Sequence, residues 1–63
     1  MNTVRYVHWQ ENGMSLGYFE DFPEYMTQGD SLAELQSNLR ELYPDLTSGV
    51  IPGIRRVGEL TIG

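Results

Sequence analysis

The sequence has no cysteine, so disulfide bridges and thiolate nucleophiles are excluded. His8 is the single histidine, and a structural zinc site would need more imidazole or thiolate ligands than the chain offers. Nucleophilic catalysis needs a base that a third group positions, whereas His8 falls in the middle of a predicted strand. No glycine-rich phosphate-binding loop occurs either. We therefore predict a protein that is not an enzyme, with no catalytic residue, no metal ligand and no cofactor.

Lysine is also absent. The chain has four arginines and nine acidic residues, which gives a net charge of −5. Binding to DNA or RNA usually needs several cations, and only Arg55 and Arg56 are adjacent, so we expect no direct contact with nucleic acid. An acidic surface suits a basic protein partner. Acidity also simply keeps a protein in solution, and charge alone favours this second interpretation.

Long apolar runs are missing too. No stretch approaches the ~20 apolar residues of a membrane span. Residues 1–10 alternate and do not form the apolar core of a signal peptide, so we expect a cytoplasmic protein without a membrane partner. With 63 residues, the chain has room for a single domain, 1–63, whose core is marginal. Because disulfides and metals are unavailable to support it, we expect a dimer or larger homo-oligomer.

The N-terminal third has the pattern of a β-hairpin. Residues 3–10 are rich in β-branched and aromatic side chains, which is typical of a strand. Asn12-Gly13 follows, and this pair is the strongest short signal for a type I′ turn. The residues from Met14 to Glu20 then form the returning strand. If Asn12 and Gly13 are the two loop residues, Glu11 faces Met14 and the whole register is fixed.

This register sorts the hairpin side chains into two groups, because residues opposite each other share a face. The more apolar group is assigned to the core beneath the helix: Val7, Trp9, Met14, Leu16 and Tyr18. The second group is Val4, Tyr6, His8, Gly17 and Phe19. Two aromatics and a valine are unusual for a solvated sheet face, and they point to a second packing partner.

A short third strand and a helix come next. Phe22-Pro23 ends the hairpin, and Tyr25 to Gln28 reads as a third strand or edge strand. Ser31 and Glu34 have the spacing of a capping box, which predicts a helix from Ser31. Its apolar stripe recurs at spacings of three and four, which is the period of a helix. The stripe consists of Leu32, Leu35, Leu39, Leu42 and Leu46.

Pro44 should interrupt this helix, since an interior proline removes a hydrogen bond and clashes one turn back. We predict a break near Tyr43, a short further turn, and an end at Ser48-Gly49. The loose alternation from Ile54 to Ile62 predicts a last strand. The resulting fold class is α+β with the order β-β-β-α-β: an antiparallel, hairpin-led sheet with one helix packed on a face.

Two clusters of charge leave alternatives open. Glu20, Asp21 and Glu24 could hold a divalent cation, but their spacing matches no loop that wraps an ion, and a solvated end of the hairpin is the favoured interpretation. Arg55 and Arg56 could contact a partner's carboxylates or a phosphate. They are equally well explained as charges that protect an edge strand.

The stretch from Gly17 to Leu35 resembles the HicB family of antitoxins. It has a Gly-aromatic strand, a Phe-Pro-acidic turn, the run Thr27-Gln28-Gly29-Asp30-Ser31, and the start of a leucine-rich helix. The resemblance implies a truncated RNase H-like fold without nuclease activity. Its implied partner is a HicA-type toxin, a small basic ribonuclease that cleaves mRNA. The sequence ends at Gly63, so we expect the N-terminal HicB-like domain without the family's C-terminal DNA-binding domain.

The leading hypothesis is a non-catalytic protein-binding module that neutralises such a toxin by direct binding. The alternative is a stand-alone homo-oligomeric regulatory module with no toxin partner. A residual metal-dependent nuclease is a third and weaker hypothesis. Exposed strand edges invite the addition of another strand, so the predicted interface lies on the third and last strands. Its residues are Tyr25, Met26, Thr27, Gln28, Arg55 and Arg56.

Overall fold

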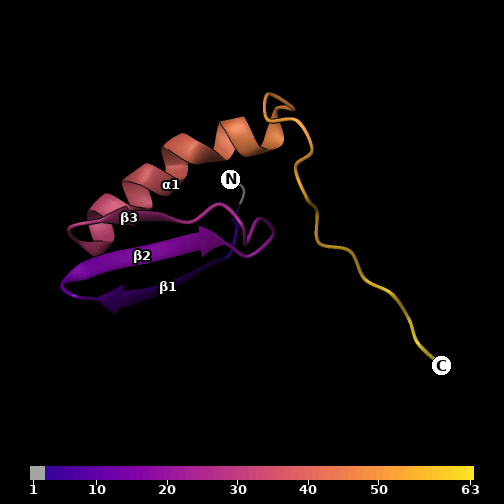
Figure 1. Cartoon of the computed structure of the whole chain (residues 1–63), viewed down its shortest axis with the longest axis horizontal. Helices are drawn as coiled ribbons and strands as arrows, with labels where there is room; N and C mark the ends of the chain where they lie inside the picture. Colours follow the sequence, from indigo (N-terminus) through magenta and orange to yellow (C-terminus); the bar gives the residue numbers. More distant parts are fainter. Residues whose placement is uncertain (1–2) are drawn as a thin grey trace.

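The computed structural model describes residues 3–63, and its first element is the predicted hairpin. Strands β1 (Tyr6–Glu11) and β2 (Met14–Phe19) pair antiparallel, and β3 (Thr27–Gly29) pairs with β2, so the sheet order is β1-β2-β3. Helix α1 (Leu32–Thr47) packs over β2 and β3 on one face of this sheet (Figure 1). The α+β class and the β-β-β-α arrangement are therefore confirmed.

The hairpin register is also confirmed, with Glu11 opposite Met14. Both loop residues have positive φ, 52° at Asn12 and 79° at Gly13, as a type I′ turn requires. The pairing continues beyond the strands, where the backbone N–H of Glu20 donates to the carbonyl of Arg5 at 3.0 Å.

The prediction of which sheet face forms the core is wrong. Along β2, burial alternates so that Ser15, Gly17 and Phe19 lie beneath α1, while the intervening side chains point to the other face. The physical reason is the closeness of the helix to the sheet. A Cβ atom placed on Gly29 would lie 2.5 Å from the backbone nitrogen of Leu35, and one on Gly17 would lie 3.1 Å from a Leu35 methyl carbon. The helix therefore packs on the glycine face, although the opposite face is richer in large apolar side chains.

The third strand is shorter than predicted and begins two residues later. Two consecutive turns precede it: the N–H of Phe22 donates to Phe19, and the N–H of Tyr25 donates to Phe22, at 2.9 and 3.1 Å. Because these turns use Tyr25, only Thr27–Gly29 remains to pair with β2.

Helix α1 begins as the capping box predicts. The Oγ of Ser31 accepts a hydrogen bond from the N–H of Glu34 at 3.1 Å, and the Glu34 carboxylate accepts one from the N–H of Asp30 at 3.0 Å. The leucine stripe faces the sheet, except that Leu32 is exposed. With the aromatic residues it forms the core, which consists of Phe19, Phe22, Leu35, Leu39 and Leu46.

The predicted break at Pro44 is wrong, because α1 continues through this residue to Thr47. Pro44 lies on the exposed side, whereas Leu46 on the last turn is fully buried in the core. Burial of a leucine side chain contributes roughly 1.5–3 kcal/mol, which offsets a proline penalty of about 3 kcal/mol. The N–H of Ser48 donates to the Pro44 carbonyl, and Gly49 at φ 84° ends the helix at the predicted place.

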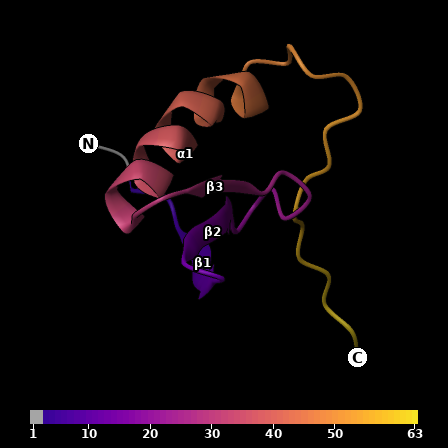
Figure 2. The same ribbon diagram turned by 60° about the vertical axis from the view of Figure 1, so that its left-hand side comes forward.

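The predicted last strand from Ile54 to Ile62 is also wrong. This segment is extended but makes no strand pairing, and it runs away from the sheet (Figures 1 and 2). Ile54 packs against the core and Arg55 forms an ion pair with Glu24, so the segment passes the turns after β2 and not a strand edge. Beyond that point Leu60 and Ile62 are exposed.

We expect Gly29→Ala to destabilise the fold by about 2 kcal/mol or more, since its methyl group would meet the helix backbone and α1 would have to shift. Gly58→Ala is the matched control, because nothing lies within 4 Å of its Cβ position. Urea unfolding followed by circular dichroism measures both. Equal midpoints for the two variants would contradict the close approach of α1.

We expect Pro44→Ala to raise the free energy of unfolding by about 1–3 kcal/mol, because it restores a helical N–H in an unbroken helix. Asp45→Ala, at the neighbouring exposed position, should change it by about 0.5 kcal/mol or less. The same urea titration distinguishes them. A destabilised Pro44→Ala protein would mean that the helix is interrupted in solution.

Candidate functional site

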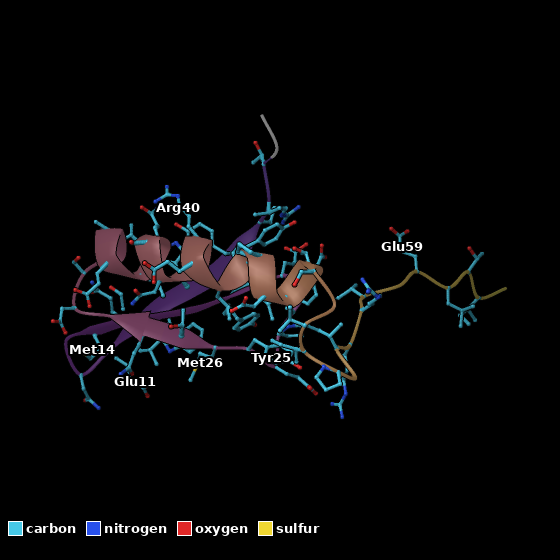
Figure 3. The ribbon with its side chains drawn as sticks, turned by 90° about the horizontal axis from the view of Figure 1, so that it is seen from above. Glu11, Met14, Tyr25, Met26, Arg40 and Glu59 are labelled. Carbon is cyan, nitrogen blue, oxygen red and sulfur yellow. The ribbon has the colours of Figure 1, made fainter. Side chains whose placement is uncertain are left out.

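The face of the sheet opposite to α1 carries apolar side chains that no other element covers in residues 3–63, and we call it the outer face. Its strand residues follow from the register, and Met26 joins them one step before β3. Figure 3 shows Met14 and Met26 on the side of the sheet away from the helix. The outer face consists of Val7, Trp9, Met14, Leu16, Tyr18 and Met26.

The outer face is accessible, and its side chains are of types that are common in protein interfaces. Trp9 is 37% exposed, Val7 38% and Met26 56%, while the remaining members are half-buried. The rings of Trp9 and Tyr18 pack edge to face with centroids 6.0 Å apart. Tryptophan and tyrosine are frequent anchors of protein interfaces, and methionine adapts to irregular apolar partners. The outer face can therefore bind apolar side chains of another protein.

Charged groups border the outer face at both ends of the hairpin. At the open end, the Nε of Arg5 lies 3.2 Å from a carboxylate oxygen of Glu20, and both side chains are well exposed. At the turn, Glu11 is exposed. An exposed pair of this kind adds little stability. Its value is as a polar rim around an apolar centre, which is the usual anatomy of a protein interface.

The predicted interface residues of the third strand are divided between several environments. Tyr25 packs against the core, and Thr27 pairs with Gly17 in the sheet. Both side chains are half-buried. Met26 joins the outer face. Gln28 is exposed, and its carbonyl accepts a hydrogen bond from the Asn38 amide at 2.7 Å. The edge of β3 is thus partly closed by a side chain of α1 and is less open to strand addition than the sequence predicted.

The other two predicted interface residues lie beside the turns that precede β3. Arg55 is held by the ion pair with Glu24, and Arg56 lines a small hollow with Asp21 and Phe22. The structure therefore brings Arg55 to the residue preceding Tyr25, so the two halves of the predicted interface meet. No strand forms at Arg55 and Arg56, so these residues do not lie on the edge of the sheet as predicted.

The groups considered for metal or acid–base chemistry are not assembled into a centre in residues 3–63. Glu20 and Glu24 each pair with an arginine, and this part of the chain has no group of three acidic or histidine side chains placed to hold a metal ion. His8 is exposed and its ring stacks on Tyr6, with the centroids 5.0 Å apart.

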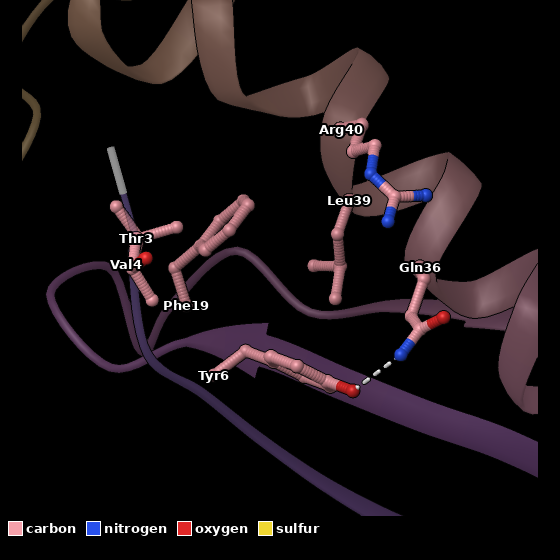
Figure 4. A pocket seen from close by; sticks show the side chains of 7 residues that line it. All are labelled: Thr3, Val4, Tyr6, Phe19, Gln36, Leu39 and Arg40. Carbon is pink, nitrogen blue, oxygen red and sulfur yellow. Dashed lines mark hydrogen bonds between the residues drawn. The ribbon is translucent and has the colours of Figure 1, made fainter. Parts of the chain in front are cut away.

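A shallow hollow of about 260 Å³ opens where α1 diverges from the start of β1 (Figure 4). At its floor, the Gln36 amide donates a hydrogen bond to the Tyr6 hydroxyl at 2.8 Å. Sites for small molecules usually exceed about 300 Å³ and enclose their ligand, so this hollow is a poor candidate for one. Its lining residues are Thr3, Val4, Tyr6, Phe19, Gln36, Leu39 and Arg40.

Comparison of the chain with models of protein families, with curated proteins and with solved structures found no match. No helix in residues 3–63 combines the length and the apolar character that crossing a bilayer requires.

The exposed outer face is the feature that reasoning from the sequence missed. The signal that could have revealed it is the placement of two glycines. Gly17 of β2 pairs with Thr27 of β3, and Gly29 lies two residues further along β3. Gly17 and Gly29 therefore lie on the same face of the sheet. A pair of glycines on one face permits the close approach of a helix, and that outweighs the larger apolar content of the other face.

We expect Phe19→Ala to cost about 3–5 kcal/mol, since this ring is 5% exposed and lies in the core. Trp9→Ala should cost about 1 kcal/mol, because the indole is partly solvated on the outer face. Unfolding by urea, monitored by far-UV circular dichroism, compares the two. A larger loss for Trp9→Ala than for Phe19→Ala would show that the faces are reversed.

Proposed function

We propose that this protein acts by binding another protein through its outer face, as a HicB-like antitoxin that neutralises a small basic ribonuclease of the HicA type. The observation that carries the proposal is the accessible group of aromatic and methionine side chains opposite α1. The resemblance of the stretch from Gly17 to Leu35 to the HicB family supplies the class of partner.

The charge of the chain supports a basic partner. Its net charge is −5, and two of its four arginines, Arg5 and Arg55, already pair with glutamates of the same chain. An approaching protein therefore meets a negative field, which speeds encounter with a cationic surface and disfavours acidic competitors.

The proposed mechanism is stoichiometric occlusion. Apolar side chains of the ribonuclease would pack against Trp9, Tyr18 and Met26, while its cations face the carboxylates at the rim of the outer face. Binding in this way covers the surface on which the ribonuclease holds RNA, so no chemical step by this chain is needed. We propose that the protein works in the cytoplasm, where mRNA is translated, without a cofactor and without contacting nucleic acid itself.

A second candidate is a stand-alone homo-oligomeric regulatory module with no toxin. It is favoured by the small core, since only five apolar residues are buried among residues 3–63. A core of this size supplies only a few kcal/mol of stability, and self-association is the remaining way to bury more apolar surface.

The test uses a small basic ribonuclease of the HicA type, sought first as the product of an adjacent reading frame. We expect this protein to inhibit cleavage of an mRNA substrate with an endpoint at a fixed molar ratio. Met26→Arg, which places a cation on the outer face, should weaken inhibition at least tenfold. Leu32→Arg is the matched control, because it replaces a comparably exposed apolar residue outside the outer face and should inhibit normally.

Circular dichroism should confirm that both variants remain folded. The antitoxin proposal fails if the folded wild-type protein neither binds nor inhibits the ribonuclease, or if the two variants lose inhibition equally.

A further inference from the structure

The free edge of β1 is the least protected part of the sheet. β1 spans six residues, and within the described residues 3–63 it pairs with β2 on one side only. It contains no proline and no lysine, and every residue pairs in register with β2, without a bulge. Native proteins usually protect such edges with these devices, because unpaired N–H and C=O groups recruit another strand. The opposite edge is different, since β3 has three residues and Asn38 occupies one of its carbonyls.

We propose that two copies of this chain pair antiparallel along β1, joining their sheets into one of six strands. The partner of this edge is thus a second copy, related by a two-fold axis through His8. The inference gives the second candidate function its contact surface, and it holds whether or not a toxin exists.

The hydrogen-bond phase of the hairpin determines which backbone groups are free. A two-residue loop makes Glu11 and Met14 a hydrogen-bonded pair, and such pairs alternate along the hairpin. The bond from the Glu20 N–H to the Arg5 carbonyl follows the same phase. The odd-numbered residues of β1 therefore bond to β2. The even-numbered residues, Tyr6, His8 and Gln10, direct their N–H and C=O groups to the free edge.

An axis through His8 uses all of these outward groups. Tyr6 then lies opposite Gln10 of the second copy, and His8 lies opposite its own equivalent. Each of these pairs is of the hydrogen-bonded type, in which two residues exchange both bonds. The register also keeps the outer faces of the two sheets on the same side, since residues opposite each other share a face.

The charges select this register over its neighbours. With the axis at His8, Arg5 lies opposite Glu11 of the second copy, and Val7 lies opposite Trp9. Both pairs occur twice because of the symmetry, and each joins side chains that stabilise adjacent strands. Moving the axis to Trp9 would place Val7 against Glu11, and moving it to Val7 would place Arg5 against Trp9. Only the axis at His8 matches charge with charge and apolar with apolar.

The helix leaves room for this pairing. α1 packs over β2 and β3, and the hollow beside Tyr6 marks where it diverges from β1 (Figures 2 and 4). In the dimer the two helices lie on the same face of the joined sheet, separated by both copies of β1. The outer faces become continuous across the axis.

Replacement of His8 by proline tests the backbone contact. Its N–H points away from β2, so His8→Pro keeps the hydrogen bonds of the hairpin and removes those at the two-fold axis. In sedimentation equilibrium we expect wild-type protein to approach twice the 7.2 kDa mass of the chain and the variant to remain at that mass. The dimer dissociation constant should rise at least about 100-fold. Circular dichroism checks that the variant is folded.

A charge exchange tests the register. Glu11→Arg places two arginines opposite each other, and Arg5→Glu places two glutamates opposite each other, so each variant alone should dimerise at least about tenfold more weakly. Mixed together they should form a heterodimer in which both charge pairs are restored. Glu41→Arg, with the same change of charge on the exposed side of α1, should dimerise as the wild type does.

A wild-type chain that remains monomeric at about 1 mM would overturn the proposal, because association that weak has no role at cellular concentrations. A dimer that His8→Pro and both charge variants leave intact would also overturn it. No ribonuclease is present in these assays. A monomer that still neutralises the toxin would therefore refute the β1 dimer alone, and a β1 dimer that ignores the toxin would refute the antitoxin function alone.

Discussion

The contact of α1 with bare backbone at Gly29 is the constraint on which the rest of this structure depends. Because no side chain separates the helix from the sheet at this point, Leu35 packs closely against the sheet and is completely buried. That contact decides which face becomes the core. It leaves the outer face uncovered by the rest of residues 3–63, so Trp9 and Val7 remain accessible. The absence of a side chain at Gly29 therefore determines which surface of the sheet is exposed.

Local features could be read from the sequence, and features that depend on distant contacts could not. The hairpin turn, its register and the cap at Ser31 follow from residues adjacent in the chain, so their patterns were sufficient. The path through Pro44 depends on how much Leu46 gains from the core. The prediction of a last strand was wrong because a strand needs a neighbouring strand with which to pair. The chain near Arg55 instead packs beside a turn.

The candidate site shows the same division. Met26 was included in the predicted interface as part of the third strand, which was expected to be an exposed edge, and its side chain is exposed in the structure. Trp9 and Tyr18 were assigned to the interior, because apolar content alone does not reveal which face a helix will cover. The free edge of β1 depends on the absence of a neighbouring strand, which only the assembled sheet reveals. A sequence of this size therefore specifies its elements better than its surfaces.

The spatial order of the strands follows their order along the chain, and this has a consequence for how the protein is made. Each new element packs on the one synthesised just before it, so contacts are short in sequence and few loops must close over long distances. Chains with low contact order fold in roughly milliseconds or less. The sheet and helix can therefore assemble soon after they leave the ribosome.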